Sequence, residues 1–85
     1  MSWTLRVARR AEKSLVRSPA KDRARLVTAI AEMQDNPFAG DVVRLQGEDN
    51  TWRRRVGSYR ILFEIDVRGL TVDVLEVARR TSTTY

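Results

Sequence analysis

Alternating apolar and polar residues predict a strand and a hairpin in this 85-residue chain. Residues 3–7 alternate with a period of two, which is typical of a half-buried strand. Residues 51–56 and residues 59–67 are two further strand-like runs, and only Gly57 and Ser58 separate them. A two-residue connection that begins with glycine predicts a β-hairpin with a type II′ turn.

Two more strands are predicted on either side of this hairpin. Residues 42–47 form a short run that ends at a glycine, and a polar turn follows at residues 48–50. Residues 70–78 are rich in Val and Leu and follow a tight turn at Arg68 and Gly69. The C-terminal half of the chain is therefore predicted to consist of strands and turns, with a polar tail.

Apolar residues at helical spacing predict two helices between the first two strands. The first helix covers residues 8–17. The second covers residues 18–34, with Ser18 as its N-cap and Pro19 at its first helical position. An Asn-Pro pair follows and ends it. The two helices form an αα-hairpin with basic outer faces.

These elements predict the fold class. The order is β-α-α-β-β-β-β, so the chain is expected to be an α+β protein with one domain over residues 1–85. The two N-terminal helices should pack on one face of a mainly antiparallel sheet of four to five strands. No apolar run approaches membrane-spanning length, and the N-terminus lacks a signal-peptide core. We therefore expect a soluble cytoplasmic protein that does not contact a membrane.

The composition excludes several kinds of chemistry. The chain contains no cysteine and no histidine, so thiolate catalysis, a serine–histidine triad and Cys/His metal sites are all excluded. The four glycines are scattered and do not form a phosphate-binding loop. The acidic residues show no pairing that suggests glycosidase chemistry. We expect neither a cofactor nor a metal.

The charge indicates a polyanionic partner. Lys and Arg number 16 against 11 acidic residues, which gives a net charge of +5. Lysine occurs only at Lys13 and Lys21, so arginine supplies most of the positive charge. Arginine carries a planar fork of donors that suits phosphate, and a strongly basic domain is typical of nucleic-acid binding. An acidic protein partner fits the same charge.

The hairpin register predicts an arginine face, which we define as Arg53, Arg55 and Arg60. With Gly57 and Ser58 as turn residues, Arg55 pairs with Arg60 and Arg53 pairs with Leu62. Like charges directly opposite each other destabilise a sheet, and such a pair suits a phosphate. The alternative is a salt-bridged surface in which Glu64 or Glu76 neutralises the arginines.

Other arginines occupy less regular positions. Arg54 falls on the apolar face of the hairpin, either at a sheet edge or with its stem covering apolar surface. The last strand ends at Arg79 and Arg80, and Tyr85 follows. If this strand lies beside residues 59–67, its end approaches the arginine face. Arginines beside an aromatic ring suit RNA, through phosphate contacts and base stacking.

Three segments resemble the RelE/ParE superfamily of toxins. Residues 52–63, WRRRVGSYRILF, resemble the basic core of the family, and Leu45-Gln46-Gly47 resembles its preceding L-x-G box. The run Val77-Ala78-Arg79-Arg80 followed by Tyr85 resembles its C-terminal segment. The RelE branch cleaves mRNA in the ribosomal A site without a metal, and the 2′-OH of the RNA attacks the adjacent phosphate. The resemblance therefore implies a type II toxin and a metal-independent endoribonuclease that arrests translation.

The resemblance also implies roles for individual residues. Arg53 and Arg55 would activate the nucleophile or bind phosphate, and Arg60 would hold the scissile phosphate. Arg80 would stabilise the leaving group or the transition state, and Tyr85 would stack on a base. Arg79 would contribute to phosphate binding. It stands where the family often has histidine, and an arginine is a poor general base at neutral pH.

Partners and alternatives follow from the same resemblance. The implied partners are an acidic cognate antitoxin, the ribosome and mRNA. A ParE-like toxin, which inhibits DNA gyrase and has no nuclease site, has the same fold and is the main alternative. Further alternatives are a non-catalytic nucleic-acid-binding domain and a superfamily member that has lost its activity.

Overall fold

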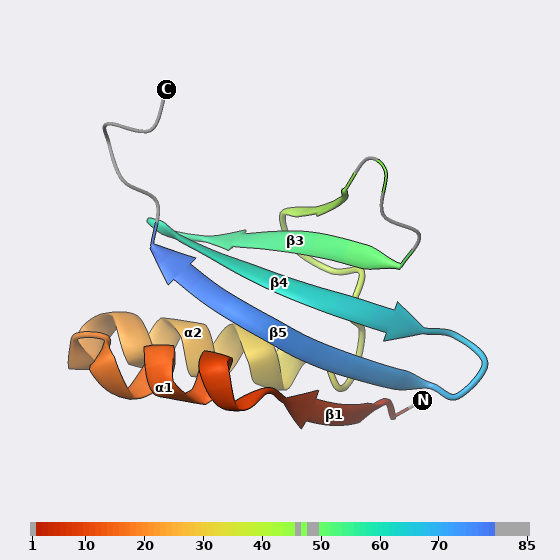
Figure 1. The fold of residues 1–85 in the computed structure, drawn as a ribbon, viewed down its shortest axis with the longest axis horizontal. Coiled ribbons are helices and arrows are strands. Elements are labelled where there is room, and N and C mark those ends of the chain that lie inside the picture. The colour runs from red at the N-terminus through yellow and green to blue at the C-terminus, as the bar shows by residue number, and fades with distance from the viewer. Residues whose placement is uncertain (1, 46, 48–49, 80–85) are drawn as a thin grey trace.

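The computed structural model describes residues 2–45, 47 and 50–79 of the chain (Figure 1). It contains two helices and five strands, which follow one another in the predicted order. The elements are β1 (Thr4–Val7), α1 (Arg9–Arg17), α2 (Ala20–Glu32), β2 (Val42–Arg44), β3 (Thr51–Val56), β4 (Tyr59–Asp66) and β5 (Thr71–Arg79). The strands lie in the order β1-β5-β4-β3-β2, and both helices cover one face of the sheet (Figure 1).

The sheet is mixed, which refines the prediction of a mainly antiparallel sheet. Strands β2 to β5 pair in antiparallel fashion, whereas β1 pairs in parallel with β5. The first strand of the chain therefore lies beside the last one. Sequence periodicity identifies a strand but says nothing about such a distant partner.

The start of α2 differs from the predicted cap. The carbonyl of Pro19 accepts the first helical hydrogen bond, from the backbone N–H of Arg23 at 2.8 Å, so Pro19 is the N-cap. Ser18 is buried, and its hydroxyl donates to the carbonyl of Ser14 at 2.8 Å. Ser18 therefore closes α1, and its predicted role as the N-cap of α2 is wrong because its hydroxyl is already bonded to the preceding helix.

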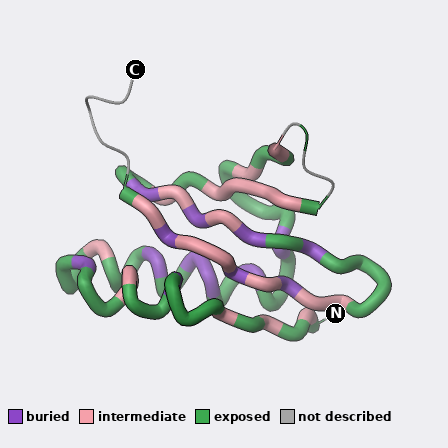
Figure 2. Tube along the Cα trace, viewed as in Figure 1, coloured by how far each residue is buried: buried purple, intermediate pink, exposed green. Residues whose placement is uncertain are grey.

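The core lies between the two helices and the sheet. Alternate residues of β4 are buried against the helices, as the period-two pattern predicts. They form one apolar cluster with buried residues of α2. Figure 2 shows the buried positions on the strands and on the helices. The buried residues are Ala11, Leu26, Ala29, Ile30, Met33, Tyr59, Ile61, Phe63, Ile65, Val72, Val74 and Val77. Neither helix in the described part of the chain is long and apolar enough to cross a membrane.

A β-bulge in β5 reverses which residues face the core. Leu62 pairs with Glu76, whereas its neighbour Phe63 pairs with Val74, so Leu75 has no partner on β4. The extra residue shifts the alternation by one position. Val74 and Val77 are therefore both buried, although they are three residues apart.

Candidate functional site

The structure confirms the predicted hairpin register. Arg55 pairs with Arg60, and Arg53 pairs with Leu62. Gly57 has a φ of +56°, and no positive φ occurs at Ser58, which fits a type II′ turn. Ile61 alternates with Arg60 and Leu62 along β4, and it is buried against the helices. The arginine face therefore lies on the other side of the sheet, away from the helices.

The arginine face contains buried guanidinium nitrogens that lack an acceptor. Nη1 of Arg53 and Nε of Arg60 are buried, and neither makes a hydrogen bond within the described residues. The Arg53 side chain is only 16% exposed. A buried donor without an acceptor costs about 1–3 kcal/mol of folding free energy. An anion that supplies oxygen acceptors would remove this cost, so the site is suited to phosphate.

Arg6 lies on the same face of the sheet, and its guanidinium is hydrogen-bonded to a carboxylate. Its Nε and Nη2 donate to the two carboxylate oxygens of Asp73 at 2.6 and 3.0 Å. This contact raises the pKa of Arg6 above its usual value, because the hydrogen bond and the negative charge of Asp73 both favour the charged form. By contrast, Nε of Arg60 makes no hydrogen bond within the described residues, although the same face supplies a carboxylate to Arg6.

The proposed neutralising acids do not pair with the arginine face. Glu76 lies opposite Leu62, and Glu64 lies opposite Thr51 and Asp73. The ion pairs between described residues join Arg6 to Asp73, Arg53 to Asp41 and Arg54 to Glu32. Neither Glu64 nor Glu76 takes part in them. The structure therefore does not show the arginine face neutralised by these two acids.

Asp41 is the acidic residue that the structure brings to the arginine face, and the sequence analysis did not identify it. It lies in the loop just before β2, and its backbone carbonyl accepts a hydrogen bond from the N–H of Arg55 at 3.0 Å. Its Oδ1 is 3.7 Å from Nη1 of Arg53, which is an ion pair beyond hydrogen-bond distance. No local pattern could reveal this contact, because it depends on how the loop meets β3.

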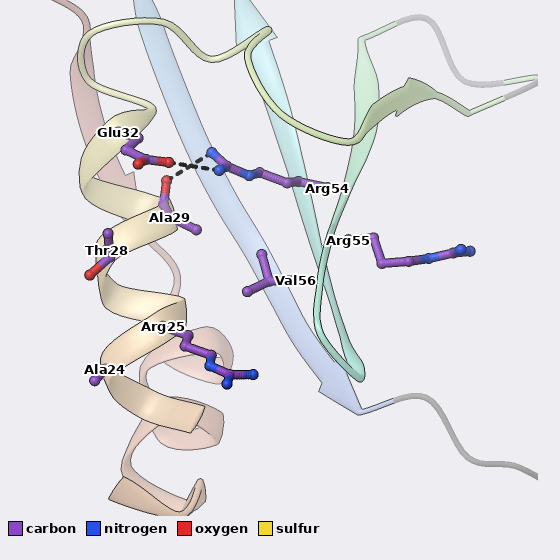
Figure 3. A pocket seen from close by; sticks show the side chains of 8 residues that line it. All are labelled: Ala24, Arg25, Thr28, Ala29, Glu32, Arg54, Arg55 and Val56. Atoms are coloured by element: carbon purple, nitrogen blue, oxygen red, sulfur yellow. Dashed lines mark hydrogen bonds and ion pairs between the residues drawn. The ribbon is translucent and has the colours of Figure 1, made fainter. Parts of the chain in front are cut away.

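Arg54 connects the sheet to α2 on the opposite side (Figure 3). Its guanidinium donates to the carbonyl of Ala29 at 3.2 Å and to the carboxylate of Glu32 at 2.7 Å. It pairs with Val42 and Ile61, so it does not lie at a sheet edge. Its head group bonds to the last turn of α2, where carbonyl groups lack helical partners.

A groove of about 440 Å³ lies between α2 and β3. Arg54 reaches across one part of it, whereas Arg55 points away on the other side of β3 (Figure 3). The lining residues are Ala24, Arg25, Thr28, Ala29, Glu32, Arg54, Arg55 and Val56. The described residues contain no group of three acidic side chains that could hold a metal ion.

The C-terminal residues of the predicted site have different outcomes. Arg79 pairs with Tyr59, which faces the helices, so the register places Arg79 on the helix side of the sheet. It therefore does not share the face of Arg55 and Arg60. The bulge at Leu75 is the reason, because it reverses the alternation before Arg79. Arg80 and Tyr85 lie outside the described residues.

Comparisons with known proteins agree on the superfamily. The family model of the ParE toxin of the type II toxin–antitoxin system parDE matches residues 5–83. The archaeal RelE–RelB complex from Pyrococcus horikoshii contains a chain with 19% identity and a TM-score of 0.85, over 98% of this chain and 100% of that one. A search of curated proteins found no match.

Two bacterial structures show the same similarity. The RelBE2 toxin–antitoxin complex from Mycobacterium tuberculosis matches with 28% identity and a TM-score of 0.82, over 94% of this chain and 100% of that one. The isolated RelE toxin of E. coli matches with 18% identity and a TM-score of 0.82, over 98% of this chain and 89% of that one. These similarities establish the shared fold.

Proposed function

The chain belongs to the ParE toxin family of type II toxin–antitoxin systems, within the RelE/ParE superfamily, and from this premise we propose that it is an RNA-cleaving toxin. Its substrate is mRNA in the ribosomal A site. The cleavage needs no metal and blocks translation.

The observation that supports this proposal is the pair of buried nitrogens, Nη1 of Arg53 and Nε of Arg60, that make no hydrogen bond within the described residues. Buried donors without acceptors favour a ligand that brings several oxygen atoms to the site. A phosphodiester supplies those acceptors, and arginine binds it through two parallel hydrogen bonds. The Arg55–Arg60 pair adds two positive charges at one position of the sheet.

The chemistry is an internal transfer within the RNA. The 2′-oxygen forms a bond to the adjacent phosphorus, the bond from phosphorus to the 5′-oxygen breaks, and the products are a 2′,3′-cyclic phosphate and a 5′-hydroxyl. Negative charge accumulates on the phosphorane oxygens in the transition state. Arg55 and Arg60 stabilise this charge, and they need little rearrangement because the strands already hold them.

Primer extension on mRNA in a reconstituted translation reaction tests the proposal. We expect Arg60→Ala to lower the cleavage rate by about 10²–10³-fold, because it removes a preorganised charge from the transition state. Arg6→Ala is the matched control, since it removes an arginine from the same face that is bonded to Asp73. Cleavage by the Arg60→Ala variant at the wild-type rate would contradict the assignment of the site.

DNA gyrase is the second candidate target. The family model that matches residues 5–83 is described as a ParE toxin, which favours this alternative. A ParE-like toxin inhibits gyrase through protein contacts and needs no cleavage site. Inhibition in a gyrase supercoiling assay, without cleavage in the translation reaction, would replace the proposed function with this one.

An antitoxin partner is part of the proposal. The similar toxin from P. horikoshii was solved in a RelE–RelB complex, and that from M. tuberculosis in the RelBE2 toxin–antitoxin complex. The E. coli toxin was also solved in the intact RelBE toxin–antitoxin complex. We expect an acidic cognate antitoxin that covers the arginine face, since its carboxylates would supply the acceptors that Arg53 and Arg60 lack. Phosphate and antitoxin would then compete for the same nitrogens.

A further inference from the structure

The proposed cleavage needs a group that accepts the proton of the 2′-hydroxyl. The chain contains no histidine, and arginine is by its chemistry a poor general base. We propose that Asp41 is this proton acceptor. The inference rests on the proposed function and names a catalytic residue for the same site.

The position of Asp41 in the sheet supports this role. Val42 pairs with Arg54, and the next position along the ladder puts Asp41 opposite Arg55. The hydrogen bond from the Arg55 N–H to the Asp41 carbonyl, at 3.0 Å, continues the ladder to this position. Residues directly opposite each other share a face. Asp41, Arg55 and Arg60 therefore form one row across the arginine face.

The carboxylate of Asp41 is accessible and held by charge. Its side chain is 57% exposed, whereas that of Arg53 is 16% exposed, so the carboxylate lies at the surface with an arginine beneath it. At 3.7 Å the two groups attract each other without forming a hydrogen bond. The exposed carboxylate oxygens are therefore accessible to an incoming hydroxyl, and the charge of Arg53 keeps the carboxylate close to the arginine face.

The loop that carries Asp41 is fixed from the helix side. Gly40 has a φ of +88°, and a Cβ there would lie 2.9 Å from Nε of Arg54. The Arg54 guanidinium is itself bonded to Ala29 and Glu32 of α2. Three consecutive arginines thus hold Gly40 and Asp41: Arg53 through charge, Arg54 through packing and Arg55 through its backbone N–H. Such a fixed position is what a general base requires.

The proton balance of the step is simple. As the 2′-oxygen bonds to phosphorus, its proton passes to the Asp41 carboxylate. As the bond from phosphorus to the 5′-oxygen breaks, that oxygen takes a proton from water. Asp41 then returns its proton to solvent, so the protein ends in its starting state and no co-reactant is consumed.

Single-turnover cleavage by the Asp41→Asn variant tests the inference. We expect the rate on ribosome–mRNA complexes to fall by about 10²–10⁴-fold, the usual contribution of a general base. Binding to complexes whose mRNA carries a 2′-deoxynucleotide at the cleavage position should be unchanged or tighter, because a negative charge is removed. Glu64→Gln is the matched control, since Glu64 is an exposed acid on the same face that forms no ion pair with another described residue, and it should cleave like wild type.

Chemical rescue separates catalysis from a structural role. Added acetate or formate should partly restore cleavage by Asp41→Ala, with acetate more effective as the stronger base, and should leave Arg60→Ala inactive. Cleavage by Asp41→Asn at the wild-type rate, or a loss that neither acetate nor formate restores, would overturn the role of Asp41 and leave the proposed function standing. Absence of cleavage by the wild-type protein would overturn both.

Discussion

At the scale of single residues, the arginines of this chain differ in how their charge is used. Arg6 and Arg54 are bonded to carboxylates, at 2.6 and 2.7 Å. Arg53 and Arg60 each keep a buried nitrogen without an acceptor. Arg6 and Arg54 therefore stabilise the fold. The unsatisfied nitrogens of Arg53 and Arg60 lower its stability and are available to bind an anion. Sites that carry such a cost are typical of functional surfaces.

This division predicts opposite stability effects for the same substitution at two positions. Arg60→Met should raise the free energy of unfolding by about 1 kcal/mol, because it removes an unsatisfied buried donor and keeps most of the apolar stem. Arg54→Met should lower it by about 1–3 kcal/mol, because the carbonyl of Ala29 and Glu32 lose their donor. Urea denaturation followed by circular dichroism measures both. A loss of stability in Arg60→Met comparable to that in Arg54→Met would show that Arg60 is satisfied.

At the scale of elements, the bulge in β5 determines how the last strand presents its side chains. Val72 and Val74 face the core before it, and Val77 faces the core after it. A regular strand cannot bury this set, because residues three apart point to opposite faces. The single extra residue, Leu75, resolves the conflict.

Deleting Leu75 is therefore expected to be severe. Without it, Val77 would turn to the solvent face or Val74 would leave the core, because a one-residue slip moves a strand's side chains to the other face. Exposing a buried valine and opening a cavity should lower the free energy of unfolding by about 3 kcal/mol or more. Leu75→Ala, which keeps the register, should cost much less. Thermal denaturation of the two variants gives the comparison, and equal melting temperatures would contradict the role of the bulge.

At the scale of the whole molecule, the positive charge lies mainly on the helices. Residues 9–25 contain seven basic and two acidic side chains, which accounts for the whole net charge of +5. The remainder of the chain, including the arginine face, is balanced overall. The helical hairpin therefore provides the long-range attraction for a polyanion, and the sheet provides the site.

Reversing charge on α1 should affect association and spare catalysis. Arg10→Glu with Arg17→Glu should slow binding to ribosome–mRNA complexes several-fold at low salt and have little effect at high salt, because screening removes the field. Both residues are exposed, so stability should change by less than about 0.5 kcal/mol. Stopped-flow binding at several salt concentrations gives the association rates. A lower single-turnover cleavage rate of the bound variant would show that α1 also acts in the chemistry.

The sequence alone determined the parts of the molecule that depend on neighbouring residues. The Gly57-Ser58 turn and the period-two pattern gave the pairs Arg55–Arg60 and Arg53–Leu62, because turn type and alternation are local properties. The two helices and the resemblance to the superfamily also follow from short stretches of sequence, namely the spacing of apolar residues and the short motifs. The Ser18 cap was wrong because its hydroxyl bonds to the preceding helix.

Only the tertiary structure decided the composition of the site. Asp41 joins the arginine face through contacts with Arg53 and Arg55, and these residues are distant in the sequence. Arg54 finds its acceptors on α2, and the bulge in β5 turns Arg79 to the helix side. The parallel pairing of β1 with β5 joins the two ends of the described chain. Each of these features depends on which distant segments pack together, and periodicity along the chain carries no information about that.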